Sequence, residues 1–455
     1  MGITFVEKGD RNRVRHHSKT GLVLAGGAIS GGAFKIGGLI ALNTYLGNKS
    51  VLDFDIYVGI SAGAFLAGPL AAGIGPEELL KSLEGGSKKI GQFSPLDFYR
   101  PNFKEFLTRP ARIGIDAALV SPAILLAIWN ELRHNRPELI DRCRAFARDP
   151  TVRNAERLVS PLVEDAALRT GLGSGRGYLP SGLFDNSGIE RFTRDNLHKN
   201  SIPNDFRLLH LERGNSLYIG ATNLNTGEGV TFGHDTDTSC TISEAVQAST
   251  AIPGFYKPAK IRGQEYVDGG VRRTANISQA TDRGAQLVFV YNPFRPFVNY
   301  HTDQLLNNKA SLSDMGIGTV INQAFRTMLH TRLMLGIEKL RLDQTFHGDV
   351  VLLEPSETDI KFFNTNPLNF WQRAESALHG YLSASEALER HHERIKTVLD
   401  SYGWKTDLGR LRDRVEPIRR KDFDSRTIMK ELQREVHTPP TGKKALQPAL
   451  RIVHG

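Results

Sequence analysis

The chain has 455 residues, of which 40% are hydrophobic and 24% charged, and its formal net charge is +9. Such a chain is long enough to bury a large core in more than one layer or domain, and its composition is that of a soluble globular protein. The two cysteines, Cys143 and Cys240, exclude a disulfide framework and fit a reducing compartment.

The first 19 residues are basic, and we interpret them as an N-terminal arm. No apolar stretch follows their Lys and Arg residues, so the segment lacks the features of a signal peptide. Myristoylation is also excluded, because Val6 stands where Ser or Thr is required. We therefore expect a cytoplasmic protein, with peripheral contact to a membrane as an open alternative.

A glycine-rich turn follows the first short apolar segment. Residues 21–24 have the composition of a buried strand, and a helix-compatible run begins at Ala33. Residues 25–32 between them either let helix and sheet pack closely or bind an anion through their backbone N–H groups and the helix N-terminus. The spacing matches neither the dinucleotide fingerprint nor the P-loop. The anion that we expect here is therefore the oxyanion of acyl transfer.

A Gly-x-Ser-x-Gly motif, made by Gly59, Ser61 and Gly63, stands between an apolar run at 54–58 and a helix-compatible run at 62–72. Small residues around a serine allow the strained strand-to-helix turn of a nucleophile elbow, which brings the hydroxyl clear of the backbone. Ser61 is therefore the candidate nucleophile.

The stretch 91–200 is predicted to be a helical insert. Pro122 splits its apolar run, so neither piece reaches the roughly 20 residues that are needed to span a bilayer. We expect two packed helices within 111–133 and a further helix near 139–148. Two interpretations stay open: these helices bury their apolar faces in a core of their own, or residues 111–133, with Trp129, form a lid that faces lipid.

Asp268 ends a predicted strand in the region 206–292, where the chain returns to the sheet. A hairpin turn at Gly263 leads into this strand, and Gly269 and Gly270 follow the aspartate. Asp-Gly pairs are common in turns, but the small neighbours also leave this carboxylate free to approach a substrate or another side chain.

A serine hydroxyl needs a general base within about 2.6 to 3.2 Å to act as a nucleophile at neutral pH. The chain has 14 histidines, but none stands in a recognisable catalytic context. A partly buried carboxylate can serve instead, because burial raises its pKa. Asp268 is the candidate for this role.

Helical spacing continues at 313–342 and 371–399, and the chain ends in a basic tail at 396–455. Either the tail is a solvated helical and flexible segment, which its mixed charges favour, or it binds anionic lipid. Nucleic acid is not an expected partner, because no zinc-finger or RNA-binding motif accompanies the charge. The alternation of strands and helices predicts an α/β fold with helices on both faces of the sheet.

Several of these segments together resemble one family, the patatin-like phospholipases. They are 22–42, 59–63, 243–255, 268–270 and 276–293. The resemblance implies a catalytic domain over 20–395, built as a three-layer sandwich in which helices flank a mostly parallel central sheet. The segments 1–19 and 396–455 would then be extensions of this domain.

The family uses a Ser-Asp dyad, and the resemblance places it at Ser61 as nucleophile and Asp268 as base. It also implies an oxyanion hole at Gly26, Gly27 and Ala28. The glycines expected to support the elbow and the aspartate turn are Gly59, Gly63, Gly269 and Gly270.

Two residues depart from the family pattern. Ala28 stands where a third glycine is usual, and Ser30 stands where Arg or Lys is frequent. An alanine still offers its backbone N–H to an oxyanion. With Ser30 in place of a basic residue, this position offers no positive charge to a substrate phosphate.

The implied activity is that of a serine lipid acyl hydrolase, which cleaves fatty acyl esters of phospholipids or other glycerolipids through an acyl-enzyme. An acyltransferase or thioesterase with the same nucleophile is one alternative, and a non-catalytic lipid-binding scaffold is another. No metal or other cofactor is expected, because no loop has calcium-ligand spacing and the mechanism requires no metal. The expected partner is a lipid or other acyl ester.

Overall fold

The computed structural model describes residues 2–102, 105, 133, 136–148, 180–299, 311–420 and 430–434. The chain forms two compact units, which we describe separately. The first comprises Met1–Arg100, Asn186–Pro253 and Pro258–Gly455, and the second comprises Pro101–Asp185 and Gly254–Lys257. The candidate lid at 111–133, with Trp129, lies outside the described residues except for Arg133.

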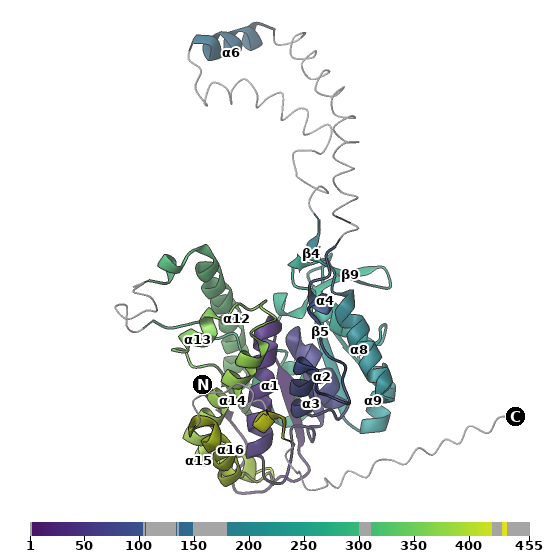
Figure 1. Ribbon diagram of the computed structural model, residues 1–455, viewed down its shortest axis with the longest axis vertical. Coiled ribbons are helices and arrows are strands. Elements are labelled where there is room, and N and C mark those ends of the chain that lie inside the picture. The colour runs from purple at the N-terminus through teal and green to yellow at the C-terminus, as the bar shows by residue number, and fades with distance from the viewer. Residues whose placement is uncertain are drawn as a thin grey trace, which may run out of the picture. The chain divides into compact units, whose positions relative to one another are not determined.

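A nine-stranded sheet forms the centre of the first unit, with the order β1-β11-β10-β2-β3-β5-β9-β8 and with β6 paired to β5 (Figure 1). The five strands from β11 to β5 run parallel, and antiparallel pairs extend the sheet at both sides. The strands are β1 Gly2–Glu7, β2 Lys19–Leu24, β3 Ile56–Ile60, β5 Ser216–Asn223, β6 Gly229–Gly233, β8 Ala259–Ile261, β9 Gln264–Asp268, β10 Ala285–Tyr291 and β11 Asp349–Glu354.

Helices cover both faces of this sheet, because the parallel strands are apolar on both sides. On one face, Val23, Val290 and Leu352 pack against α11 (Ser278–Thr281) and α12 (Ile317–Leu342). On the other face, Tyr291 of β10 contacts Phe34 of α1 (Ala28–Tyr45), which packs along α14 (Arg373–Arg390). The predicted mostly parallel sheet flanked by helices is confirmed.

Further helices surround these layers. They are α2 Ala62–Ala71, α3 Pro76–Glu84, α4 Pro95–Phe98, α8 Ser187–Lys199, α9 Phe206–Arg213, α10 Ile242–Ser249, α13 Ile360–Asn364, α15 His392–Asp400 and α16 Leu408–Arg420, with 3-10 turns η2 Gly269–Val271 and η4 Leu312–Met315. The helix predicted at 313–342 corresponds to α12. The one predicted at 371–399 is two helices, α14 and α15, which meet at His391.

The basic N-terminal segment contributes to the sheet. Its first residues form β1, which pairs antiparallel with β11 from Gly2 opposite Glu354 to Glu7 opposite Asp349. Only the residues between β1 and β2 lie outside the strands, so part of the segment that we expected as an arm is the edge of the sheet.

The second unit holds a small parallel pair of strands, β4 Gly182–Phe184 and β7 Gly254–Tyr256, and helix α6 Arg136–Arg148. The helix predicted near 139–148 is therefore confirmed. An ion pair of 2.7 Å between Lys257 and Asp185 follows the strand pair.

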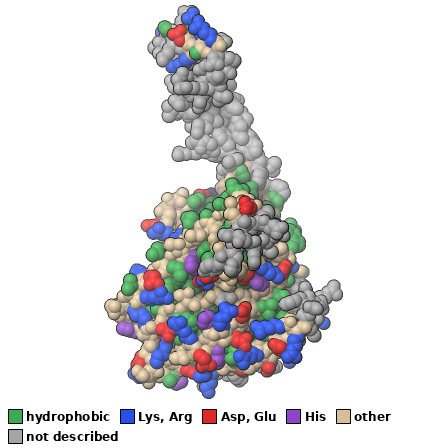
Figure 2. Space-filling view, turned by 90° about the vertical axis from the view of Figure 1, so that its left-hand side faces the viewer, with side chains coloured by type: hydrophobic (Ala, Val, Ile, Leu, Met, Phe, Trp, Pro, Cys, Tyr) green, Lys and Arg blue, Asp and Glu red, His purple; other side chains and the backbone are tan. Residues whose placement is uncertain are grey.

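The surface of the first unit is uneven in polarity. In Figure 2, Lys, Arg, Asp and Glu side chains are interspersed over the lower part of the main body, and hydrophobic side chains are more frequent in its upper part. Within the described residues, no helix combines the length and hydropathy that a membrane span requires.

Candidate active site

Ser61 occupies a sharp turn between β3 and α2. Its backbone has φ 56° and ψ −128°, a conformation that costs a non-glycine residue roughly 1 to 3 kcal/mol. A Cβ atom on Gly63 would lie 2.0 Å from the carbonyl oxygen of Leu24, and one on Gly59 would lie 2.5 Å from Cα of Ala64. The turn therefore requires both glycines, as the elbow motif predicted.

Ser249 stabilises this turn by a hydrogen bond, and the sequence did not indicate this role. This buried residue ends α10, and its Oγ accepts a hydrogen bond of 2.8 Å from the backbone N–H of Ser61. The same hydroxyl donates to the carbonyl of Gly220 in β5 at 2.6 Å. Ser249 thus joins the strained turn to the sheet through two hydrogen bonds.

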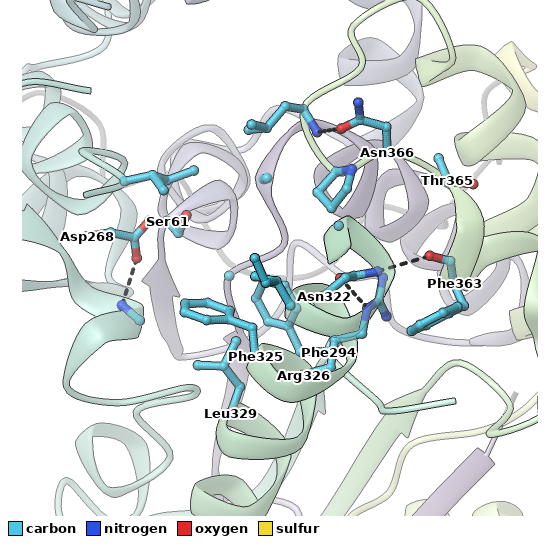
Figure 3. A pocket seen from close by; sticks show the side chains of 18 of the residues that line it. Ser61, Asp268, Phe294, Asn322, Phe325, Arg326, Leu329, Phe363, Thr365 and Asn366 are labelled. Atoms are coloured by element: carbon cyan, nitrogen blue, oxygen red, sulfur yellow. Dashed lines mark hydrogen bonds between the residues drawn. The ribbon is translucent and has the colours of Figure 1, made fainter. Parts of the chain in front are cut away.

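Asp268 stands at the end of β9 and is buried, with 7% of its surface exposed. Its carboxylate accepts a hydrogen bond of 2.7 Å from the N–H of Gly270. A side chain on Gly269 would meet the carbonyl oxygen of Gly220 at 2.4 Å, so this turn also depends on glycine. The structure brings Asp268 to the same pocket as Ser61, although the two are far apart in the sequence (Figure 3).

Burial raises the pKa of Asp268 to about 6, although hydrogen bonds from Ser61 and Gly270 and the charge of Lys35 act in the opposite direction. A carboxylate with this pKa is ionised at neutral pH and is more basic than an exposed aspartate. It therefore has the properties of a general base for a neighbouring hydroxyl.

The glycine-rich turn leads from β2 into the N-terminus of α1, beside Ser61. A Cβ atom on Gly26 would contact Cβ of Ser61 at 3.4 Å, and one on Gly27 would lie 2.7 Å from Cγ of Pro293. Ala28 has φ 50°, in the left-handed region that favours glycine. The alanine at this position therefore carries backbone strain that the glycine usual in the family would avoid.

Lys35 lies beneath the glycine-rich turn, and the sequence analysis missed it as well. It belongs to α1 and is fully buried, and its Nζ donates hydrogen bonds to the carbonyls of Ala25 and, at 2.9 Å, Gly26. Burial lowers the pKa of Lys35 to about 7, and the charge of Asp268 opposes this shift. The sequence does contain one indication of this role, a single lysine within the apolar run from Ala33 to Leu42. A lysine is almost never fully buried without a partner, so a buried lysine at this position implies a specific contact.

A cavity of about 800 Å³ opens over these residues, within the size range of small-molecule sites. Ser61, Asp268, Gly26 and Ala28 form its floor, and its walls are largely apolar. The large apolar side chains that line it are Ile252, Val271, Phe294, Met315, Ile321, Phe325, Leu329, Phe363 and Leu368. Figure 3 shows Phe294, Phe325 and Leu329 around the space next to Ser61. The dimensions and polarity fit an acyl chain.

One buried cation, Arg326 of α12, also lines the cavity. It donates to the carbonyls of Pro293 and Arg295 at 3.1 and 3.3 Å and to the side chain of Asn322 at 3.1 Å. Burial lowers the pKa of Arg326 to about 10, so the group stays protonated at neutral pH. Among the described residues, no group of three or more His, Cys, Asp or Glu side chains is placed to hold a metal ion.

An α/β sheet that carries an apolar cavity over a strand-to-helix serine turn is an architecture of ester-hydrolysing enzymes. The family model described as Patatin-like phospholipase matches residues 22–281 of the 455. The chain belongs to this family, whose members are lipid acyl hydrolases, so the family and the enzyme class expected from the sequence are confirmed.

Two solved structures are similar to this chain. VipD from Legionella pneumophila has 19% sequence identity and a TM-score of 0.35, and the match covers 86% of this chain and 70% of that chain. ExoU from the type III secretion system of Pseudomonas aeruginosa, solved in complex with SpcU, has 15% identity and a TM-score of 0.26 over 94% of this chain and 72% of that chain.

Proposed function

We propose that the protein hydrolyses fatty acyl esters of phospholipids or other glycerolipids, with Ser61 as nucleophile and Asp268 as general base. The observation that carries the proposal is that these two buried side chains line one largely apolar cavity. Neither residue has this environment by local structure alone, since the elbow and the β9 turn come from opposite ends of the family domain.

In the proposed cycle, Asp268 accepts the proton of the Ser61 hydroxyl while Oγ forms a bond to the ester carbonyl carbon. The resulting oxyanion is stabilised by the backbone N–H groups of Gly26, Gly27 and Ala28. Collapse breaks the bond to the alcohol, which takes the proton from Asp268 and leaves a Ser61 acyl ester. Water then attacks the acyl carbon while Asp268 accepts one of its protons. The bond between this carbon and Oγ of Ser61 breaks, Oγ takes the proton back from Asp268, and the fatty acid is released.

Lys35 supports the oxyanion loop in this mechanism. A trans peptide unit points its C=O and N–H in opposite directions. The carbonyls of Ala25 and Gly26 face Nζ of Lys35, so the N–H groups of the same two peptide units, those of Gly26 and Gly27, face away from it. In its protonated form, Lys35 also adds positive charge beside the loop where the oxyanion would develop. We therefore assign Lys35 a positioning role.

The first prediction concerns the dyad. Ser61→Ala and Asp268→Asn should each reduce release of fatty acid from phospholipid at least about 10³-fold, because members of a nucleophile-base pair act as a unit. Lipid mass spectrometry measures the release, and thermal melting checks that the variants fold. A fluorophosphonate probe should label Ser61 in the wild type and leave Ser61→Ala unlabelled.

The alternatives give different results in the same experiment. A non-catalytic scaffold would show no labelling of the wild type at Ser61. An acyltransferase would pass the acyl group to an added alcohol or thiol acceptor in preference to water, and a thioesterase would prefer thioesters to glycerolipids. Wild-type rates in either dyad variant contradict the assignment of these residues.

A further inference from the structure

Helix α12 exposes a stripe of large hydrophobic side chains along its length. Its members are Ile317, Ile321, Phe325, Met328, Leu335 and Leu342, which are exposed by 54 to 79%. A single exposed leucine is ordinary, but six large apolar side chains exposed along one helix mark an interaction surface. We call these six residues the α12 stripe.

The stripe lies outside the core of the first unit. The buried residues Leu333 and Ile337 of α12 pack in the core on the sheet, and Leu329, also buried, lines the cavity. At 3.6 residues per turn, five of the six stripe residues, all except Phe325, fall within about 60° of one another, on the side of the helix away from this core face. α12 is therefore apolar on two sides: its core side is buried, and the side that carries the stripe is exposed.

The stripe is continuous with the candidate active site. Ile321 and Phe325 line the cavity that holds Ser61, and they are 59% and 54% exposed. Figure 3 shows Phe325 at the cavity beside Leu329, on the helix that bounds it. A ligand that covers the stripe would therefore also cover one side of the cavity mouth.

Positive charge accompanies the apolar residues. On α12, Lys339 is exposed and Arg332 is partly exposed, whereas the single acidic residue of the helix, Glu338, pairs with Arg341. Arg332 donates to the carbonyls of Gly270 and Val271 at 3.0 and 2.6 Å, which places its charge beside the turn that follows Asp268. Exposed Arg272 and Arg273 come next in that turn. Apolar side chains flanked by cations fit a surface of anionic lipid.

We propose that the α12 stripe docks on a lipid surface that contains anionic phospholipid, and that it delivers substrate from this surface to the cavity. The delivery of substrate rests on the proposed function, but docking itself needs no catalysis and is tested without it.

The test of docking uses Ser61→Ala protein, so that the vesicles stay intact. Met328→Glu with Leu335→Glu should weaken co-sedimentation with vesicles of phosphatidylcholine and phosphatidylserine at least tenfold. The matched control is Leu208→Glu with Leu211→Glu on α9, where the two leucines are 53% and 67% exposed, and it should bind like the parent. Added salt, or vesicles without phosphatidylserine, should also weaken binding of the parent.

A second arm uses the active enzyme. Met328 and Leu335 do not line the cavity, so their double variant should hydrolyse a short soluble ester at the wild-type rate. It should hydrolyse phospholipid in anionic vesicles at least tenfold more slowly than the wild type. If the double variant lost activity on both the soluble ester and the vesicles but still bound vesicles normally, the proposal that the stripe docks on lipid would be wrong.

The remaining outcomes also decide between proposals. Absence of vesicle binding by the parent, or equal weakening by the α9 control pair, overturns lipid docking. A dimer in light scattering that only the α12 pair disrupts, with unchanged vesicle binding, assigns the stripe to a contact between two copies of the chain. Normal vesicle binding by a protein that hydrolyses no ester leaves docking in place and rejects the proposed function.

Discussion

Lys35 is a charged residue whose position depends entirely on its surroundings. Its side chain is fully buried, and its hydrogen bonds go to the carbonyls of Ala25 and Gly26 rather than to a carboxylate. Burying an ammonium is costly unless its hydrogen bonds are satisfied. A buried cation beside the candidate oxyanion loop and near Asp268 is therefore best explained by a role in the site.

We predict that Lys35→Met lowers kcat about 10²-fold with little change in KM, because the loop donors lose their fixed orientation. The charge of Lys35 lowers the pKa of Asp268, which burial raises to about 6. Activity of the wild type should fall as the pH drops through about 6, since Asp268 must be ionised to act as base. Without the cation this fall should begin at a higher pH.

Steady-state kinetics on a soluble ester, at a series of pH values between about 4.5 and 9, measure both the change in kcat and the position of the acidic limb. Lys260→Met is the control, because the Lys260 side chain is 72% exposed and pairs only with Glu265 at the surface. A folded Lys35→Met enzyme with the wild-type kcat and an unmoved acidic limb would show that this lysine has only a structural role.

The sequence located the serine turn, the glycine-rich loop and the aspartate turn because each has a local pattern of strand, small residues and helix or turn. The structure brings all three to one cavity. Lys35 and Ser249 could not be found in this way, because their roles depend on partners elsewhere. Ser249, for example, bonds the backbone of Ser61 and of Gly220, and no spacing in the sequence encodes that contact.

At the scale of elements, α12 shows that hydrophobic periodicity alone does not predict which side of a helix is buried. Its apolar residues fit one helix, as predicted, but Ile317 and Phe325 are exposed while Leu329 and Leu333 are buried. The hydrophobic pattern identifies a helix without saying which of two apolar sides meets the sheet. β1 was missed for a related reason, because an edge strand among basic residues is defined by its pairing with β11.

The close contact between α1 and α14 depends on two glycines, one on each helix, and each lies against the backbone of the other helix. A Cβ atom on Gly37 would lie 1.8 Å from the carbonyl oxygen of Ala377, and one on Gly380 would lie 2.0 Å from that of Phe34. These helices form the layer that carries the glycine-rich loop at its N-terminal end. Their spacing therefore helps to fix the position of the loop.

We predict that Gly37→Ala lowers the free energy of unfolding by about 1 to 3 kcal/mol, because the methyl group forces the two helix backbones apart. Gly336→Ala is the matched control: it is exposed on α12, and an added Cβ atom meets nothing within 4 Å. That change should stabilise the protein by about 0.5 to 1 kcal/mol, the usual effect in a helix. Urea unfolding measures both, and equal effects of the two substitutions would contradict the close helix contact.

At the scale of the whole first unit, Asp349 joins the segment after β1 to the segment after α15. It begins β11 and is fully buried, and it accepts hydrogen bonds from Arg11 at 2.7 Å, from Arg15 at 3.2 Å and from the hydroxyl of Tyr402 at 2.7 Å. The backbone N–H groups of Lys8 and Gly9 bond it as well. The basic segment after β1 is thus anchored to the sheet and to the region after α15.

Burial alone would raise the pKa of Asp349, but the hydrogen bonds from Arg11, Tyr402 and Gly9 outweigh it, so the pKa lies below its ordinary value. A group whose pKa is lower in the folded state stabilises the fold at pH values above its unfolded pKa of about 3.9. This contribution is lost as the pH falls through the lower, folded value.

We therefore predict that Asp349→Asn lowers the free energy of unfolding by about 3 kcal/mol at pH 7, since it leaves partly buried arginines without their carboxylate. The difference from the wild type should stay constant down to about pH 4 and shrink below it, because Asp349 then binds a proton in the unfolded chain and, at still lower pH, in the folded protein. Urea unfolding at a series of pH values measures this. Asp195→Asn, at an exposed ion pair with Arg194, should change stability by less than about 1 kcal/mol. A difference for Asp349→Asn that grows as the pH falls would mean that the carboxyl is not held ionised in the folded protein. The segments after β1 and after α15 would then be joined by neutral contacts instead.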